Sequence, residues 1–469
     1  MRFLSVFLTF LLTLTACAAP AQPTLAPAEE IELKSDGPVL DGTFEASLLV
    51  TEWRGSSEGN VLFPLDPAKG TALSGYTPIA LGHTFSHAFS PDRGTLAVVS
   101  FPNESAYNGS LLFINLPTWE TQRFELKLSG WVHSMVFSPD GKQLAIAHGE
   151  SRFTLTMIHV KEGMITGQSQ IDSYVSRLKF TKDGQSLMLY RPTIDPANGL
   201  TAGPPQVLLL NAADLAPRWS AELKEVRDGI FPKTEDVTPS NIHEPGQAFY
   251  SSPGLVFAPE RDLLYIVHAD SEQLTTVDFA SQTVKTVAIQ PRLTWFDQLL
   301  SLTAGVAHAK IGDGISRQAV ISPDGRFLYV VGVNSSTSVD DSGTWQMEQS
   351  LLGLEILATN DGNRLEHIDT DTTEVSISPD GRFLYLRNWG NHEDYIPWTE
   401  IFDIENEKRI TRKTGISGMP ALLMNGEYLL VSTYSTGEYT HHMSVLEPEG
   451  LKVLAEWSAP MYIWWLTAP

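Results

Sequence analysis

Cysteine is almost absent from this chain, because only Cys17 carries a thiol among 469 residues. A single cysteine excludes an internal disulfide. Once Cys17 is set aside, a thiol nucleophile and a metal site built on thiolates are excluded as well. The fold must therefore depend on its hydrophobic core. With 42% hydrophobic residues, a chain of this length can form several small domains or one large array of repeats.

Basic charge and catalytic motifs are also scarce. Lysine and arginine together number 32 against 55 acidic residues, and the resulting net charge of −23 argues against a surface that binds nucleic-acid phosphates. The sequence contains no Gly-Lys-Ser/Thr phosphate loop and no His-Glu-x-x-His zinc helix. We therefore expect no nucleic-acid partner, no metal and no cofactor, and we assign no catalytic residue.

One apolar run has the features of a targeting signal. Residues 3–14 follow the positive start Met1-Arg2 and are too few to span a bilayer. The run ends in Leu14-Thr-Ala-Cys17, which resembles the lipobox of bacterial lipoproteins. The resemblance implies cleavage after Ala16, acylation of Cys17 and stable attachment to a membrane through two or more acyl chains. An ordinary signal peptide with a chance cysteine is the alternative.

This interpretation divides the chain into three parts. Residues 1–16 are the expected signal peptide, and residues 17–40 are the lipidated cysteine and a tether rich in alanine and proline. A segment of this composition has little to pack, so it would hold the folded domain, residues 41–469, away from the lipid. We therefore expect the protein in the bacterial cell envelope, lipid-anchored and facing the extracytoplasmic side.

The folded part repeats a short turn motif. Phe137-Ser-Pro-Asp-Gly141, for example, is followed by the apolar residues 144–147. Proline presets φ at the first central position of a turn, aspartate suits the next position, and glycine accepts the left-handed conformation that follows. Each copy therefore predicts a hairpin between two buried strands. Complete or degenerate copies begin at Phe89, Phe137, Phe180, Phe257, Ile321, Ile377 and Leu422.

Most copies are followed by two further strand-like runs, such as residues 111–115 and 123–126. Four strands per repeat are typical of one propeller blade. The sequence resembles the bacterial propellers with a Ser-Pro-Asp-Gly turn, in the broad group of YVTN-type, TolB-like and WD40-like repeats. The resemblance implies an all-β fold, namely a β-propeller of seven or eight four-stranded blades.

The two ends of the domain supply strands without a hairpin of their own. Residues 46–50 and 60–63 precede the first hairpin, and residues 461–466 follow the last repeat. If the N- and C-terminal strands pair, they close the ring and remove the exposed edges that invite aggregation. The literal count then favours eight blades, whereas seven remain if the N-terminal strands complete another blade.

Unequal spacing of the repeats predicts a face with enlarged loops. Strand assignment places the extra length at residues 226–251, 291–317, 332–349 and 388–398. All four connections open on the face opposite the Ser-Pro-Asp-Gly turns, and insertions collected on one face are typical of a binding surface. Neutral drift in loop length is the alternative, because long loops cost little stability.

Polar and aromatic residues near the start of the innermost strands are candidates for this binding face. They precede the apolar anchor of each repeat, and their offsets from it differ, so they need not all point the same way. The candidates are His87, Trp131, His133, Arg177, Tyr250, Arg317 and Glu374.

The absence of catalytic motifs favours a non-enzymatic module that binds an envelope protein or an extracellular ligand through this face. A lactonase-like hydrolase is an alternative, since propeller lactonases have similar hairpins and use polar residues around the channel. A quinoprotein or sugar-binding propeller is a second alternative. The fold cannot decide among them, because propellers serve unrelated functions.

Overall fold

A computed structural model describes residues 48–465 except 55–58, 67–68, 102–108, 127, 129, 151, 196–197, 234–246, 291–312, 340–344, 379, 389–397, 407, 415–420, 423–428, 436–439, 447–451 and 461–462. The expected signal peptide, Cys17 and the tether lie outside these residues. Every regular element described is a β-strand. Across the described residues, no helix is long and apolar enough to cross a membrane.

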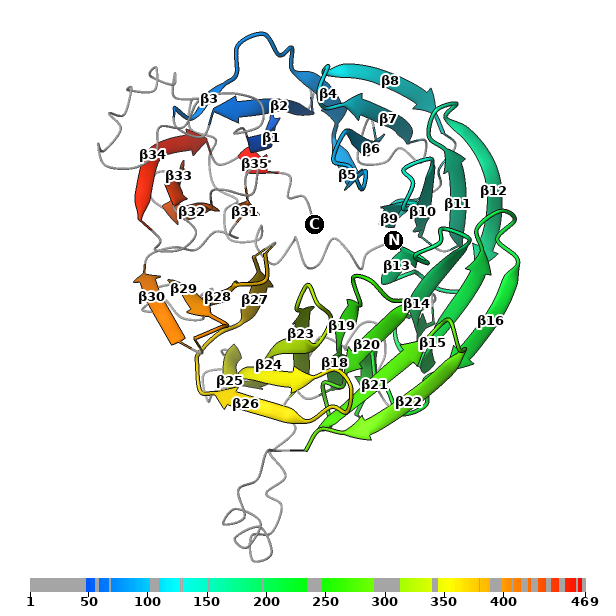
Figure 1. Ribbon diagram of the computed structural model, residues 1–469, viewed down its shortest axis with the longest axis vertical. Coiled ribbons are helices and arrows are strands. Elements are labelled where there is room, and N and C mark those ends of the chain that lie inside the picture. The colour runs from blue at the N-terminus through cyan, green and yellow to red at the C-terminus, as the bar shows by residue number, and fades with distance from the viewer. Residues whose placement is uncertain are drawn as a thin grey trace, which may run out of the picture.

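The strands form eight sheets that follow one another around a ring (Figure 1). Six of these sheets contain four antiparallel strands that are consecutive in the chain. The first three are β5 (Thr84–Phe89), β6 (Thr95–Phe101), β7 (Ser110–Asn115) and β8 (Glu120–Glu125); β9 (Trp131–Phe137), β10 (Gln143–Gly149), β11 (Phe153–His159) and β12 (Met164–Ile171); and β13 (Arg177–Phe180), β14 (Ser186–Ile194), β15 (Thr201–Asn211) and β16 (Pro217–Glu222).

The other three regular sheets complete most of the ring. They are β19 (Gly254–Phe257), β20 (Leu263–Val267), β21 (Gln273–Asp278) and β22 (Thr283–Ala288); β27 (Glu374–Ile377), β28 (Phe383–Asn388), β29 (Trp398–Asp403) and β30 (Lys408–Thr414); and β31 (Ala421–Leu422), β32 (Leu429–Ser435), β33 (Thr440–Leu446) and β34 (Val453–Pro460). In each sheet the first strand lies near the centre of the ring and the fourth lies at the rim (Figure 1).

One sheet joins the two ends of the chain. It contains β1 (Leu48–Trp53), β2 (Asn60–Asp66), β3 (Thr71–Ala72), β4 (Ile79–Gly82) and β35 (Ile463–Trp465). Strand β35 pairs with the inner side of β1, where Trp465 lies opposite Val50. The prediction that N- and C-terminal strands close the propeller is therefore confirmed.

The remaining sheet has six strands. They are β17 (Gly229–Pro232), β18 (Ala248–Ser252), β23 (Gly314–Ile321), β24 (Phe327–Val339), β25 (Trp345–Ala358) and β26 (Arg364–Ile368). The β17–β18 hairpin comes before the β19–β22 sheet in the chain, but β18 pairs in parallel with β23 of the following sheet. The β17–β18 hairpin therefore joins the sheet of β23–β26 and not the β19–β22 sheet that follows it in the chain.

Two of the four predicted loops are partly strands. The β17–β18 hairpin occupies much of the described part of residues 226–251, and β24 and β25 continue through residues 332–339 and 345–349. These connections are enlarged, but part of their length is paired strand, because backbone pairing continues where the apolar alternation of the sequence has stopped. Residues 291–312 and 389–397 of the other two predicted loops lie outside the described residues.

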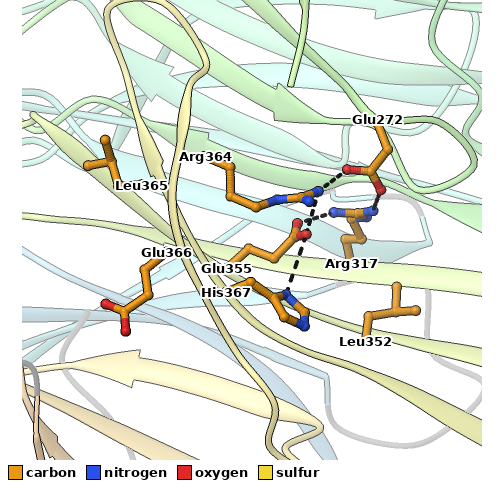
Figure 2. A pocket seen from close by; sticks show the side chains of 8 residues that line it. All are labelled: Glu272, Arg317, Leu352, Glu355, Arg364, Leu365, Glu366 and His367. Carbon is orange, nitrogen blue, oxygen red and sulfur yellow. Dashed lines mark hydrogen bonds and ion pairs between the residues drawn. The ribbon is translucent and has the colours of Figure 1, made fainter. Parts of the chain in front are cut away.

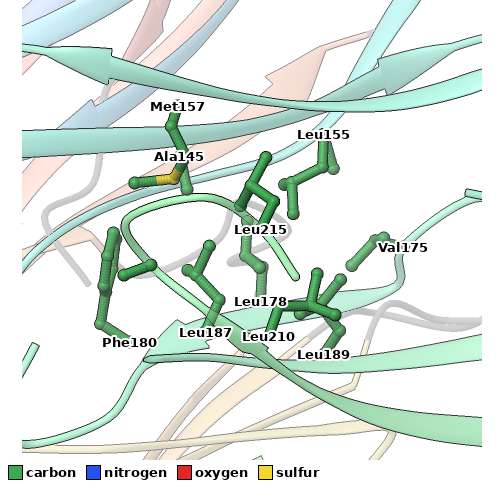
Figure 3. Packing of buried hydrophobic residues seen from close by; sticks show 12 residues of the cluster. Ala145, Leu155, Met157, Val175, Leu178, Phe180, Leu187, Leu189, Leu210 and Leu215 are labelled. Atoms are coloured by element: carbon green, nitrogen blue, oxygen red, sulfur yellow. The ribbon is translucent and has the colours of Figure 1, made fainter. Parts of the chain in front are cut away.

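Neighbouring sheets pack face to face, which explains the unbroken apolar runs. On β10, Ala145 and Ala147 pack against the β13–β16 sheet, whereas Leu144 and Ile146 pack against the β5–β8 sheet. Figure 3 shows the first of these clusters, in which Leu189 is fully buried. A middle strand is therefore buried on both faces, and each large side chain contributes roughly 1.5–3 kcal/mol.

The Ser-Pro-Asp-Gly turns are held by a repeated hydrogen-bond arrangement. The Ser138 hydroxyl donates to Asp140 Oδ1 at 2.7 Å and accepts the Gln143 N–H at 2.9 Å, while Gly141 has a φ of 69°. The bond from the Ser138 hydroxyl, followed by one from the Lys142 N–H, lowers the pKa of Asp140 to about 2. The same hydroxyl-to-carboxylate bond recurs in Ser90–Asp92, Thr181–Asp183, Ser322–Asp324 and Ser378–Asp380.

Candidate functional site

The candidate residues lie on inner strands but do not form one site. His87, His133, Arg177 and Glu374 belong to the innermost strands β5, β9, β13 and β27, and Arg317 lies on β23, between β18 and β24. Trp131 begins β9 and Tyr250 lies on β18. Their contacts divide them into a cluster around Asp228, an ion-pair network around Arg317, and residues that lie apart.

Asp228 precedes β17 and is buried, with only 8% of its surface exposed. The hydroxyl of the fully buried Tyr190, on β14, donates to Asp228 Oδ2 at 2.8 Å. Burial raises the pKa of Asp228 to about 6, although this hydrogen bond and the charge of Arg177 oppose the rise. A buried carboxyl that titrates near neutral pH is a recognised indicator of a functional site.

Three further side chains lie close enough to interact electrostatically with this pair or with one another. Arg177 lies opposite Tyr190 in the β13–β14 ladder and is exposed. Tyr174 is half-buried, and burial followed by the charges of Asp228 and Tyr250 raises its pKa. Tyr250 itself is 47% exposed. We call these five residues, Tyr174, Arg177, Tyr190, Asp228 and Tyr250, the Asp228 cluster; it presents a cation and an aromatic ring to solvent beside a buried carboxyl.

His133 lies beside the Asp228 cluster. Its ring centre is 5.7 Å from that of Tyr174 and 5.4 Å from that of Phe153. Its Nε2 donates to the carbonyl oxygen of Gly149 at 2.9 Å, and burial lowers its pKa, so the ring is neutral at neutral pH. With its Nε2 proton bound to the backbone, the His133 ring is fixed in place and forms a wall of the cluster beside Tyr174.

A glycine lets the hairpin approach the cluster. Gly229 follows Asp228 and has a φ of 121°, in a region that disfavours side chains. A Cβ on Gly229 would also collide with the Thr201 hydroxyl of β15. Glycine here therefore allows β17 to lie against the β14–β15 hairpin and brings Asp228 within reach of Tyr190.

Arg317 belongs to a separate network between two sheets (Figure 2). Its guanidinium bonds Glu355 on β25 at 2.7 Å and Glu272, from the β20–β21 turn, at 2.9 Å. Arg364 on β26 contacts the same two carboxylates, and His367 lies 3.9 Å from Glu355. These side chains line a surface hollow of about 480 Å³.

The inner part of this network is structural. The Arg317 and Glu355 side chains are only 5% and 8% exposed. Removing one partner of a buried ion pair leaves an unpaired charge, at a cost of about 3–5 kcal/mol. Arg317 therefore links the β19–β22 sheet to the neighbouring sheet through Glu272. The charge of Arg317 is already paired with Glu272 and Glu355.

The last three candidates lie apart from both groups. Glu374 forms an ion pair with Arg387, which is 1% exposed. The ring of His87 lies 5.9 Å from that of Phe89, and Trp131 lies 6.4 Å from Phe101. Glu374 and His87 are thus placed by contacts within their own sheets, whereas Trp131 contacts a residue of the neighbouring β5–β8 sheet. Where the structure describes the chain, no three histidine, cysteine or acidic residues are grouped so that they could hold a metal ion.

The sequence did not point to Tyr174, Tyr190 or Asp228. Tyr190 ends the apolar run of residues 187–190 and has the pattern of a core residue. The Asp228-Gly229 pair is a turn signal, but only the tertiary fold brings it to Tyr190. The partners of Arg317 were equally hidden, because Glu272 and Glu355 come from a turn and a strand of two different sheets.

Comparisons with known proteins give the fold and no family. No family model and no curated protein matches the chain. Among solved structures, the dihydro-heme d1 dehydrogenase NirN in complex with DHE aligns over 88% of this chain and 73% of its own, with a TM-score of 0.53 and 13% identity. The C-terminal WD40 domain of Sif2 aligns over 79% and 84%, with a TM-score of 0.45 and 13% identity. At such identities, the likeness to NirN supports the β-propeller fold alone.

Proposed function

We propose that this protein is a lipid-anchored propeller of the bacterial cell envelope that binds a protein or an extracellular ligand without catalysing a reaction. The observation that carries the proposal is the Asp228 cluster. It combines residues of the β13–β16 sheet with the β17–β18 hairpin, on the face where the β14–β15 and β24–β25 hairpins are extended. Rigid strands hold its exposed groups in place, as a binding surface requires.

The exposed members of the cluster have the chemistry of contact residues. Tyrosine presents a large, stiff ring with a polar end, and arginine presents planar donors, and both types are enriched where binding energy is concentrated. Arg177 is exposed and Tyr250 is 47% exposed, so both can be substituted without opening the core. The buried Asp228–Tyr190 pair lies behind them.

The experiment is an affinity purification with matched variants. The full chain carrying Arg177→Ala and Tyr250→Ala is compared with wild type and with a Lys142→Ala, Arg382→Ala control, whose exposed substitutions lie on the opposite face. Detergent extracts of the envelope are the source of partners. We expect one set of neighbours to be retained by wild type and control and lost by the Arg177/Tyr250 variant.

Two results would count against the proposal. Retention of every partner by the Arg177/Tyr250 variant would exclude the Asp228 cluster, and loss in the Lys142/Arg382 control alone would move the binding surface to the turn face. Replacing all of residues 226–251 would be a poorer test than these point substitutions, because β17 and β18 belong to a sheet.

Asp228 also provides the one observation that favours the hydrolase alternative. A carboxyl with a pKa of about 6 is suited to general acid–base chemistry. Lactone hydrolysis by the wild type that disappears in Asp228→Asn, with partner binding unchanged, would favour that alternative.

A further inference from the structure

Among the described rim strands of five or more residues, β12 is the one with neither a charged residue nor a proline, although the β11–β12 ladder shifts register between Met157 and Ile158. β12 is eight residues long and pairs only with β11 in the part of the chain described. A rim strand exposes unpaired backbone N–H and C=O groups along its outer side, and proteins normally block such edges with charge or proline. The sequence of β12, Met-Ile-Thr-Gly-Gln-Ser-Gln-Ile, contains neither.

The other rim strands of five or more described residues are protected. Each carries at least one charged side chain, and β16 and β34 also contain proline. The charges include Arg123 in β8, Glu222 in β16, Lys285 in β22, Glu366 in β26, Arg412 in β30 and Glu456 in β34. The absence of charge from β12 is therefore a local property of one edge and not of the rim.

Exposed apolar side chains gather at the same strand. Met164 is 61% exposed and Ile165 is 42% exposed, and both lie at the start of β12. Large apolar groups beside an open edge are typical of a surface that another strand covers.

We propose that β12 is the contact by which two copies of this chain associate, through antiparallel pairing of β12 with β12 across a two-fold axis. Such pairing would extend each four-stranded sheet into one sheet of eight strands. The same patch then serves both copies, as two-fold symmetry requires, and main-chain hydrogen bonds supply the contact.

Charged residues at the ends of β12 favour a second copy of this chain as the partner that pairs with the strand. Lys161 is exposed just before the strand, and the Asp172 side chain just after it is 96% exposed even though it touches Arg191. In an antiparallel pair, the start of one strand lies beside the end of the other, so Lys161 of each copy lies near Asp172 of the other. Glu162, the remaining charge of this turn, contacts His159 of its own chain.

The net charge of the chain supports the same choice of surface. Each copy has a formal charge of −23, so most surfaces of two copies repel one another. An uncharged edge with one cation and one anion at its ends avoids that repulsion. Because β12 lies at the rim (Figure 1), this contact leaves the Asp228 cluster accessible and does not depend on the proposed function.

The test measures association of the full chain by sedimentation equilibrium in a density-matched detergent. A single eight-residue ladder is a small interface, so we expect a dissociation constant in the roughly micromolar range. Gln168→Lys places like charges near each other at the centre of the pair and should weaken association at least about tenfold. Gln122→Lys, the same change at an exposed position on the rim strand β8, is the control and should have no effect, and the melting temperature of Gln168→Lys accounts for loss of its bond to Thr156.

Hydrogen exchange provides a second measurement that does not depend on a variant. Backbone amides of residues 164–171 should exchange more slowly as the wild-type concentration rises from about 1 µM to about 100 µM, a range that brackets the expected dissociation constant. A wild type that stays monomeric throughout, or a dimer that Gln168→Lys leaves unchanged, would overturn the proposal. Protection of these amides only after addition of an envelope extract would also overturn it, in favour of a strand from another protein.

Discussion

Replacing Asp228 by asparagine should make the protein more stable at pH 8 and leave its stability at pH 4 nearly unchanged. Asparagine has the same shape and keeps an oxygen that can accept the Tyr190 hydroxyl, but it carries no charge. The substitution therefore removes only the cost of ionising a carboxyl that is 8% exposed. Its effect should consequently depend on pH.

The sign and size of this stability change follow from the pKa of Asp228. Asp228 has a folded-state pKa of about 6 against an ordinary value of 3.8. Below pH 3.8 both the folded and the unfolded chain hold the proton, so no penalty exists. As the pH rises, the unfolded chain loses its proton first, and above pH 6 the folded state carries the full penalty. A difference of about two pH units corresponds to about 3 kcal/mol, which is the upper limit for the gain in Asp228→Asn.

Urea unfolding followed by tryptophan fluorescence at pH 4 and pH 8 measures the difference. Asp140→Asn is a control of opposite sign, because hydrogen bonds from Ser138 and Lys142 hold the pKa of Asp140 at about 2. That variant should lose stability at pH 8, where the wild-type carboxylate is ionised. Destabilisation by Asp228→Asn at pH 8, or an equal effect at both pH values, would refute the reasoning about Asp228.

Three further predictions test the anchor, the ring and a turn. Cys17→Ser should abolish lipidation and leave uncleaved precursor or soluble product, and an unmodified Cys17 in mass spectra of the wild type would contradict the anchor. Deletion of residues 461–469 removes β35 from β1 and should lower the unfolding temperature and its cooperativity, whereas melting at the wild-type temperature would show that β35 does not close the ring. Arg93 has a φ of 56° at the turn position where Gly141 has 69°. Arg93→Gly should therefore raise the free energy of unfolding by about 0.5–1 kcal/mol, and Gly141→Arg should lower it by at least as much. A lower free energy of unfolding in Arg93→Gly would exclude backbone strain at this turn.

The turns show how far local sequence determines the fold. Proline, aspartate and glycine each have an intrinsic reason to occupy their positions, so the hairpins and the strands beside them could be predicted. The reason for serine appears only in three dimensions: the Ser138 hydroxyl bonds both Asp140 and the N–H of Gln143, five residues away. Pairing of β35 with β1 was predictable for a different reason, because an open ring would leave two bare edges.

Arg177 and Tyr250 were among the candidates, but their grouping with Tyr174, Tyr190 and Asp228 was beyond prediction because no period or motif connects these residues. Tyr190 has the pattern of a buried strand residue, Asp228 that of a turn, and Tyr250 that of a loop. The parallel pairing of β18 with β23 passes over the sheet that follows it in the chain, and strand order in sequence gives no sign of such a step. The Arg317 network has the same character, since one conspicuous arginine does not reveal which distant carboxylates will meet it.

The energetic contrast between these two groups is an argument about function. In the Arg317 network, each buried charge faces an opposite charge, and such an arrangement is explained by structure alone. Asp228 differs because its folded-state pKa is raised, which means that its environment opposes the ionised form at neutral pH. Asparagine would fill the same space and accept the same hydrogen bond without this cost. A residue whose ionisation opposes folding is expected where that residue serves binding or chemistry. The exposed Tyr250 and Arg177 beside Asp228 favour binding.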